Sequence, residues 1–350
     1  MNLRPALLAV SIIAAAFAVA CGSGSSGSRS TPGPGATPAA TSGPSQTGAG
    51  HIIFTTQEGL DEFDVASGST KPLLRPDNKD TFILDPAVSP DDKQIAYIAQ
   101  PPPKTQGNTY DAGSDLWVAD RDGSNPHAVF VHVQPNQLVR VPQWEDATHI
   151  LAVVSELATA GGTTSVTYTL ERIDIATGQR TNVLDDVLAF GLTPDHKTMA
   201  YAKLGQQTGE TLVGIPVAGG TPTTLVDTTA ELAPFNSPRY SPDGSTVAFA
   251  SADQTGARAD FEYVTSRAFA PMPAPRLDGL PEDIWTMPAS GGAPRRVADI
   301  KEDLPALTWS GDGKHIYVIG VNALYDVDLT SGAVDKIGPG SFHGQLVWTP

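Results

Sequence analysis

Cysteine is almost absent from this sequence, because Cys21 is the only one in 350 residues. With a single thiol no intramolecular disulfide can form, so a folded domain must be stabilised by its core alone. The seven histidines show none of the HxH or HxxxH spacings that zinc sites use. The sequence therefore supports neither a disulfide framework nor a zinc centre.

Basic residues are also few, since 22 Lys and Arg face 38 Asp and Glu, for a net charge of −16. Arg4 and Arg29 are the only charged residues before residue 51, so the segment 51–350 has two positive charges fewer than the whole chain and carries −18. A surface this acidic repels phosphate backbones and anionic lipid headgroups. We therefore expect no nucleic-acid partner.

The motifs of common catalytic sites are missing as well. No GxSxG elbow and no nucleotide-binding loop occurs. The stretch "DRDGSN", residues 120–125, alternates oxygen-bearing side chains as calcium loops do, but it lacks the downstream glutamate that completes such a loop. We expect no catalytic residues, no bound metal and no cofactor.

Long hydrophobic runs are limited to one, "ALLAVSIIAAAFAVA" at residues 6–20, which follows Arg4. It is shorter than the roughly 20 residues of a membrane span and suits the core of a signal peptide. It ends in "AVAC", which resembles a bacterial lipobox, with Ala18 where leucine is preferred. The resemblance implies that Cys21 is diacylated; the alternative is ordinary secretory cleavage after Ala20. We interpret residues 1–21 as a lipoprotein signal peptide, so the protein is exported and anchored to the bacterial membrane, facing the periplasm or the exterior.

Residues 22–50 consist mainly of Gly, Ser, Pro, Thr and Ala. Such a segment has almost nothing to bury and is expected to be disordered. As a flexible coil it would extend roughly 30 Å from its anchor. We interpret it as a tether.

What the remaining residues contain is a repeat. The stretch "SPDGSTVAFAS", residues 241–251, joins a tight Pro-Asp-Gly turn to a short apolar strand. Five copies of this pattern occur along the chain. The others are "SPDDKQIAYIA" from Ser89, "EDATHILAVVS" from Glu145, "TPDHKTMAYAK" from Thr193 and "SGDGKHIYVIG" from Ser310.

Each copy continues into a third strand with a turn at its end, and then into a short fourth strand such as "HAVF" (127–130), "TNVL" (181–184) or "RRVA" (295–298). A unit of four antiparallel strands in roughly 40–50 residues is typical of a propeller blade. The third strands and their turns are "DLWVADRDG" (115–123), "TLERIDIATG" (169–178), "TLVGIPVAGG" (211–220), "DIWTMPASGG" (283–292) and "ALYDVDLTSG" (323–332).

The two ends of the segment complement each other. Residues 51–74 supply second, third and fourth strands without a first, and "QLVWTP" (345–350) supplies a first strand alone. Joining them closes the ring and removes an exposed sheet edge. A seventh blade in 251–282 is the rival, but that segment is too short for four more strands. We predict an all-β fold over 51–350, a six-bladed β-propeller with four antiparallel strands per blade, in which the C-terminal strand completes the N-terminal blade.

These repeats resemble the WD-like Pro-Asp repeats of TolB-type six-bladed propellers over residues 51–350. The resemblance implies the fold. TolB proteins also carry a separate N-terminal α/β domain, where this chain has a linker, so the resemblance does not carry over their partner in the Tol–Pal system.

Three sets of recurring residues are expected to be structural. Aromatic residues recur at one place on the first strands and at another on the third strands, which indicates packing between blades. The aspartates of the repeated turns are expected to cap those turns. The sets are Trp144, Tyr240, Trp309 and Trp348; Trp117, Trp285 and Tyr325; and Asp91, Asp146, Asp195, Asp243 and Asp312.

In an antiparallel blade the uniform short turns share one face of the disc, and the irregular loops share the other. Irregular loops on a rigid scaffold are where binding usually occurs. The first strands begin at the irregular face, so their first polar residues are expected at the channel mouth. The irregular loops are 99–114, 131–139, 155–167, 228–236 and 251–282, and the mouth residues, our candidates for partner binding, are Asp85, Arg140, Asn236, Asp303 and His343.

The sequence thus favours a membrane-anchored, non-catalytic propeller that binds a protein or peptide at the bacterial cell envelope, as a monomer whose contact with the membrane is its lipid anchor. One alternative is a propeller-mouth enzyme of the lactonase, sugar-dehydrogenase or polysaccharide-lyase type, which would need the mouth residues to converge. Another is a carbohydrate-sensing module, for which Tyr110, Phe261 and Tyr263 are the candidate loop aromatics.

Overall fold

A computed structural model describes residues 50–102, 112–160, 163–205, 210–226, 231–253, 281–341 and 344–350. The signal peptide with Cys21, the linker up to residue 49 and His343 lie outside these residues, as do Tyr110, Phe261 and Tyr263. Within the described ranges no helix has the length and apolar character needed to span a bilayer.

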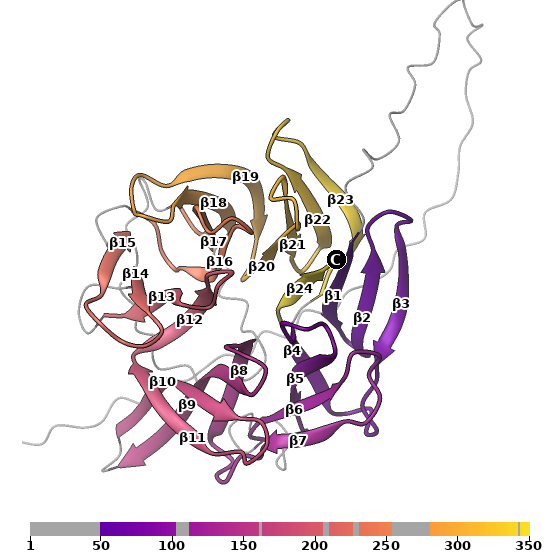
Figure 1. Ribbon diagram of the computed structural model, residues 1–350, viewed down its shortest axis with the longest axis vertical. Coiled ribbons are helices and arrows are strands. Elements are labelled where there is room, and N and C mark those ends of the chain that lie inside the picture. The colour runs from indigo at the N-terminus through magenta and orange to yellow at the C-terminus, as the bar shows by residue number, and fades with distance from the viewer. Residues whose placement is uncertain are drawn as a thin grey trace, which may run out of the picture. The chain divides into compact units, whose positions relative to one another are not determined.

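The strands form six four-stranded sheets arranged in a ring, the blades of a propeller (Figure 1). Blade 1 contains β24 (Leu346–Thr349), β1 (His51–Thr56), β2 (Gly59–Asp64) and β3 (Ser69–Leu74). Blade 2 contains β4 (Phe82–Val88), β5 (Gln94–Gln100), β6 (Asp115–Asp120) and β7 (His127–Phe130). Blade 3 contains β8 (Gln137–Trp144), β9 (His149–Ala160), β10 (Thr163–Asp174) and β11 (Arg180–Asp185). Blade 4 contains β12 (Val187–Leu192), β13 (Thr198–Leu204), β14 (Glu210–Pro216) and β15 (Thr223–Val226). Blade 5 contains β16 (Asn236–Tyr240), β17 (Thr246–Ser251), β18 (Glu282–Pro288) and β19 (Arg295–Glu302). Blade 6 contains β20 (Ala306–Trp309), β21 (His315–Ile319), β22 (Ala323–Asp328) and β23 (Val334–Pro339).

The ring closes where the two ends of the propeller meet. β24 pairs antiparallel with β1, with Cα partners running from His51 and Thr349 to Phe54 and Leu346. The prediction of six blades, completed by the C-terminal strand, is therefore confirmed.

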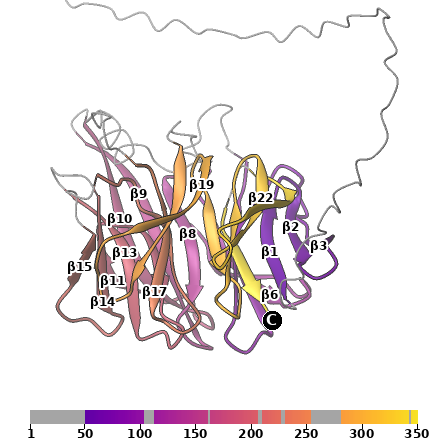
Figure 2. The ribbon, with the colours of Figure 1, turned by 90° about the horizontal axis from the view of Figure 1, so that it is seen from above.

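The short turns share one face of the disc, as predicted. Strands are counted here within each blade from the innermost outwards, so in blade 1 the second and third strands are β1 and β2. In every blade the first residue after the third strand donates its N–H to the carbonyl of the residue just before the second strand, at 2.8 to 3.1 Å. Figure 2 shows the strands running between this short-turn face, where the C-terminus lies, and the opposite, irregular-loop face. The donor and acceptor residues are Val65 and Gly50, Arg121 and Lys93, Ile175 and Thr148, Val217 and Lys197, Ala289 and Ser245, and Leu329 and Lys314.

The aromatic residues of the first strands join neighbouring blades. The indole N–H of Trp144 donates to the carbonyl of Ala87 in blade 2 at 3.0 Å, and that of Trp309 donates to the carbonyl of Arg239 in blade 5 at 3.1 Å. Trp348 lies so close to Gly311 in blade 6 that a side chain there would collide with its ring. Their predicted role in packing between blades is confirmed.

The turn aspartates act as caps, also as predicted. In four turns the carboxylate accepts a hydrogen bond from the Ser or Thr hydroxyl two residues earlier, at 2.5 to 2.8 Å. In the fifth, Asp146 accepts from the backbone N–H of Thr148 at 2.7 Å. The four are Asp91, Asp195, Asp243 and Asp312.

Blade 3 differs from the expectation of an irregular loop at 155–167. There β9 and β10 are each 12 residues long, so the two strands continue as a hairpin on the irregular-loop face. Thr, Val and Tyr dominate "TTSVTYT" and favour extended backbone. Leu157 also donates its N–H to the carbonyl of Asn136 at 3.1 Å, which fixes the hairpin to the preceding segment.

Candidate functional site

Three of the inner strands share a backbone irregularity. Asp85, Val141 and Ser237 each stand directly before a proline and have φ values of 52°, 52° and 47°. The pairing register with the neighbouring strand shifts at each of these positions. Proline has no N–H for the ladder and is therefore found at such bulges. The bulge takes backbone groups out of the ladder, so that they can bond across the ring.

Asp85 is the centre of these cross-ring contacts. It is fully buried, and its carboxylate accepts from Arg140 Nε at 2.7 Å and from Arg140 Nη2 at 3.4 Å. The backbone N–H groups of Val141 and Gln345 also donate to it, each at 3.0 Å. Burial opposes ionisation of Asp85, but the charge and hydrogen bonds of Arg140 and the two N–H groups outweigh it, so its pKa is lowered. Asp85 is therefore an ionised carboxylate with four donors from two other blades.

Gln345 extends this network to the far side of the ring. Its Oε1 accepts from Ser237 Oγ at 3.0 Å and from Arg239 Nη2 at 2.8 Å. Arg239 Nη1 in turn donates to the carbonyl of Phe190 in blade 4 at 3.0 Å. Ser237 Oγ accepts the N–H of Leu307 in blade 6 at 3.1 Å. One continuous set of hydrogen bonds thus connects all six blades.

The predicted mouth residues are only partly brought together. Asp85 and Arg140 form the ion pair described above, inside the ring. Asn236 is buried apart from them and donates to both oxygens of Glu282, at 2.6 and 2.8 Å. Asp303 is half-buried just before β20, and His343 lies outside the described residues. In the part of the chain that the structure describes, no three His, Cys, Asp or Glu side chains are placed to hold a metal ion.

Sequence reasoning missed Ser237, Arg239 and Gln345. A signal was present for the first of these, because "DPAV", "VPQW" and "SPRY" place a proline two residues before the last residue of the strand in three blades. That recurrence marks the shared bulge. Nothing in the repeat indicates that Arg239 reaches Gln345, which lies 106 positions away.

Two further buried carboxylates belong to blade 5. Glu282 accepts from Asn236, and Glu302 accepts from the hydroxyl of Tyr325 and from Asn322 Nδ2. Burial and the bond to Glu302 raise the pKa of Tyr325. Both carboxylates therefore act as hydrogen-bond acceptors at the irregular-loop end of blade 5, Glu282 at the start of β18 and Glu302 at the end of β19.

The irregular-loop face of blade 2 exposes three large apolar side chains: Phe82, Val131 and Val133 are 40%, 56% and 78% exposed. We call these three residues the apolar triplet. His132, between the two valines, is fixed by Asp115, whose Oδ1 accepts from His132 Nδ1 at 2.6 Å and from its backbone N–H at 2.9 Å. The valines are thus held at the surface by a polar anchor rather than left on an unsupported loop.

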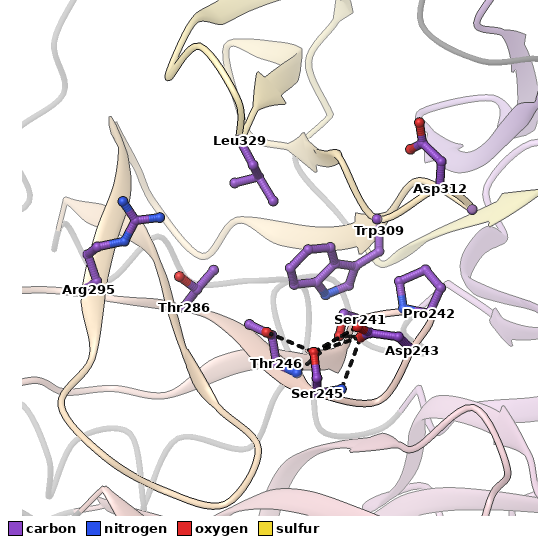
Figure 3. A pocket seen from close by; sticks show the side chains of 12 residues that line it. Ser241, Pro242, Asp243, Ser245, Thr246, Thr286, Arg295, Trp309, Asp312 and Leu329 are labelled. Atoms are coloured by element: carbon purple, nitrogen blue, oxygen red, sulfur yellow. Dashed lines mark hydrogen bonds between the residues drawn. The ribbon is translucent and has the colours of Figure 1, made fainter.

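A hollow of about 520 Å³ lies on the short-turn face between blades 5 and 6 (Figure 3). Trp309 and Leu329 form its apolar side and the turn from Ser241 to Thr246 its polar side. The carboxylate of Asp243 accepts from Ser241 and Ser245 within that turn. The polar groups of the Ser241–Thr246 turn are therefore engaged in turn structure, while Thr286 and Arg295 also line the hollow.

A closed ring of six four-stranded blades, with Pro-Asp turns on one face, gives this chain the fold of a TolB-like β-propeller. The structure of a putative TolB from Agrobacterium tumefaciens is 15% identical, with a TM-score of 0.50 over 86% of this chain and 98% of that one. TolB from Acinetobacter baumannii is 18% identical, with a TM-score of 0.47 over 82% of this chain and 68% of that one. A puromycin-hydrolysing peptidase from Mycobacterium tuberculosis is 13% identical, with a TM-score of 0.46 over 84% of this chain and 44% of that one. No family model and no curated protein matches the sequence.

Proposed function

We propose that this protein is a lipid-anchored, non-catalytic propeller that binds a protein or peptide at the bacterial cell envelope through its irregular-loop face. The observation that carries the proposal is the apolar triplet on blade 2. Among the described residues only four large hydrophobic side chains are exposed, and three of them belong to this triplet. All three lie at the irregular-loop end of blade 2, Phe82 at the start of the inner strand β4 and the two valines just after the outer strand β7, and exposed apolar side chains are typical of interaction surfaces.

The blade 3 hairpin adds polar groups beside this surface. Its Leu157 bonds to Asn136, and Glu156 accepts from Gln137, so the hairpin is joined to the segment that carries Val131 and Val133. An interface needs an apolar centre with a polar rim. The triplet supplies the first and the hairpin with its neighbours supplies the second.

The attachment of the tether agrees with this choice of face. Gly50 takes part in the repeated short-turn bond of blade 1, so the chain enters the propeller at the short-turn face. An anchor at Cys21 would therefore be connected to that face. The proposed binding surface is on the opposite face from this point of entry.

The binding proposal is tested by cross-linking in native envelopes. We expect the double variant Val131→Glu, Val133→Glu to lose the cross-linked partner that the wild-type protein captures, because two charges replace the apolar contact. Val334→Glu is the matched control, since Val334 is 37% exposed but lies at the start of β23, at the short-turn end. All three proteins should melt at similar temperatures. Capture that survives in the double variant, or is lost in the control, contradicts the proposed face.

The anchor is tested separately with Cys21→Ser. The variant should move from the membrane fraction to the soluble exported fraction, with an unchanged melting temperature. Cofractionation of Cys21→Ser with membranes in high salt would contradict lipidation as the means of attachment.

A further inference from the structure

Arg239 is a cation held only by neutral acceptors. Its Nη1 donates to the carbonyls of Phe190 at 3.0 Å and Pro238 at 2.9 Å, and its Nη2 donates to Gln345 Oε1 at 2.8 Å. A guanidinium has five N–H donors. Among the described residues the Nε–H and the second N–H of Nη2 have no partner.

The charges around it do not balance. Within the network that connects the blades there are two guanidinium groups, those of Arg140 and Arg239, and one carboxylate, that of Asp85. Asp85 is already bonded by Arg140 and by two backbone N–H groups. The network therefore carries one excess positive charge, although residues 51–350 as a whole carry a net charge of −18.

Arg239 remains charged under ordinary conditions. Burial lowers the pKa of Arg239 to about 10. The nearby negative charge of Asp85 acts in the opposite direction and raises it, but the effect of burial is larger. At pH 7 the side chain is still protonated. A partly buried cation whose hydrogen bonds go only to neutral acceptors destabilises the fold, so a bound anion would relieve that cost.

We propose that Arg239 binds a small monocarboxylate at the centre of the ring. Nε and Nη2 lie on the same edge of the guanidinium, and their parallel N–H groups match the two oxygens of a carboxylate. The side chain is partly exposed, which gives a small anion access to it. One negative charge neutralises the network, whereas a phosphate dianion would leave a negative excess in an already acidic protein. The site does not depend on the irregular-loop face or on the anchor.

The first experiment measures melting temperature against sodium formate, with sodium chloride keeping the ionic strength constant because chloride cannot bridge the two N–H groups of the fork. We expect a saturable rise, on the order of 5 °C at about a hundred-fold excess over the dissociation constant. Arg239→Gln should abolish the rise, and Arg239→Lys should reduce it by removing the fork. Arg295→Gln, which removes an exposed arginine from β19, should respond like the wild type. A rise that does not saturate, or that is equal in Arg239→Gln, overturns the proposal.

A second variant supplies the anion from within the chain. In Gln345→Glu the new carboxylate would stand where Oε1 accepts from Arg239 Nη2. We expect this variant to melt higher than the wild type without formate and to show no response to formate. A lower melting temperature together with an intact formate response overturns the proposal.

A third measurement uses the wild-type protein alone, in case Arg239 variants fail to fold. The ¹⁹F resonance of trifluoroacetate should broaden on addition of protein and sharpen again when formate, but not the same concentration of chloride, is added. An unchanged linewidth overturns the proposal.

Discussion

The innermost and outermost strands of the blades have opposite surroundings. On β4, five of seven residues are buried, and all four residues of β20 are buried. On β11 and β23 no residue is buried. The inner strands also carry the three bulges that precede a proline, the indole bonds between blades and the hydrogen-bond network around Asp85. The stability of the ring therefore depends on strands that meet strands of other blades, while the outer strands mainly cover their own blade.

The largest effect is expected from removing an inner strand. Truncation after Gly344 deletes β24, which leaves the edge of β1 unpaired and removes the N–H that Gln345 donates to Asp85. Loss of the buried Leu346 alone costs about 2–5 kcal/mol, a large part of a typical stability of about 5–15 kcal/mol. We expect a large fall in melting temperature or aggregation, measured by scanning fluorimetry and size-exclusion chromatography. Deletion of Pro350 alone is the control, and a truncated protein that melts like the full chain would contradict the closure.

The next effect separates a buried inner carboxylate from an exposed turn carboxylate. Asp85→Ala leaves Arg140 buried without its counter-charge, which costs about 3–5 kcal/mol. Asp91→Ala removes a cap from an exposed turn of the same blade and should cost much less. Urea unfolding measures both free energies. Equal losses of unfolding free energy in the two variants would show that the inner network stabilises the fold no more than an exposed turn does.

The aspartates of the short turns are expected to make the stability of the fold depend on pH under acidic conditions. Hydrogen bonds from Lys93 and Ser89 lower the pKa of Asp91 to about 2, and bonds from Ser241 and Ser245 lower that of Asp243 to about 2. An unfolded aspartate titrates near pH 3.9. Because the folded pKa is the lower one, the stability from these caps is present above about pH 4 and is lost as the pH falls towards 2.

We therefore expect the melting temperature to decline between pH 4 and pH 2, and the decline to be shallower in Asp243→Asn. Circular dichroism melts at several pH values measure this. An equally steep decline in the variant would assign the acid sensitivity to other groups.

The smallest effect is expected on an outer strand. Val334→Thr changes a partly exposed residue of β23 and should alter the free energy of unfolding by less than about 0.5 kcal/mol. Urea unfolding is again the measurement. A loss comparable to that of Asp85→Ala would remove the distinction between inner and outer strands.

The sequence predicted the ring because the repeat reports it directly. Turn, second strand and third strand recur at fixed spacing, and the unmatched ends at His51 and Thr349 proved to be neighbours. The site was harder to predict. Asp85 and Arg140 were expected near one another and do meet, but Asn236 bonds instead to Glu282 within its own blade.

The recurring proline marks the bulges, but which side chains meet at the centre also depends on how far each side chain reaches across the ring, and a repeat pattern does not specify that. Arg239 illustrates this, since it follows an ordinary Ser-Pro pair and yet bonds to Gln345, 106 positions away. The hairpin of β9 and β10 differs from the expected irregular loop because the other blades offer no template for its extra length.

The repeated bond from Val65 to Gly50 has a consequence for the topology of the chain. In the other blades the corresponding acceptor belongs to a continuous turn between the first and second strands, whereas in blade 1 this is where the chain is open. The propeller is therefore a circle whose opening occupies the place of one short turn. Joining Pro350 to Gly50 through a turn such as Ser241–Ser245 and opening the circle at another short turn would yield a circular permutant with the same six blades, because every blade offers the same place to begin.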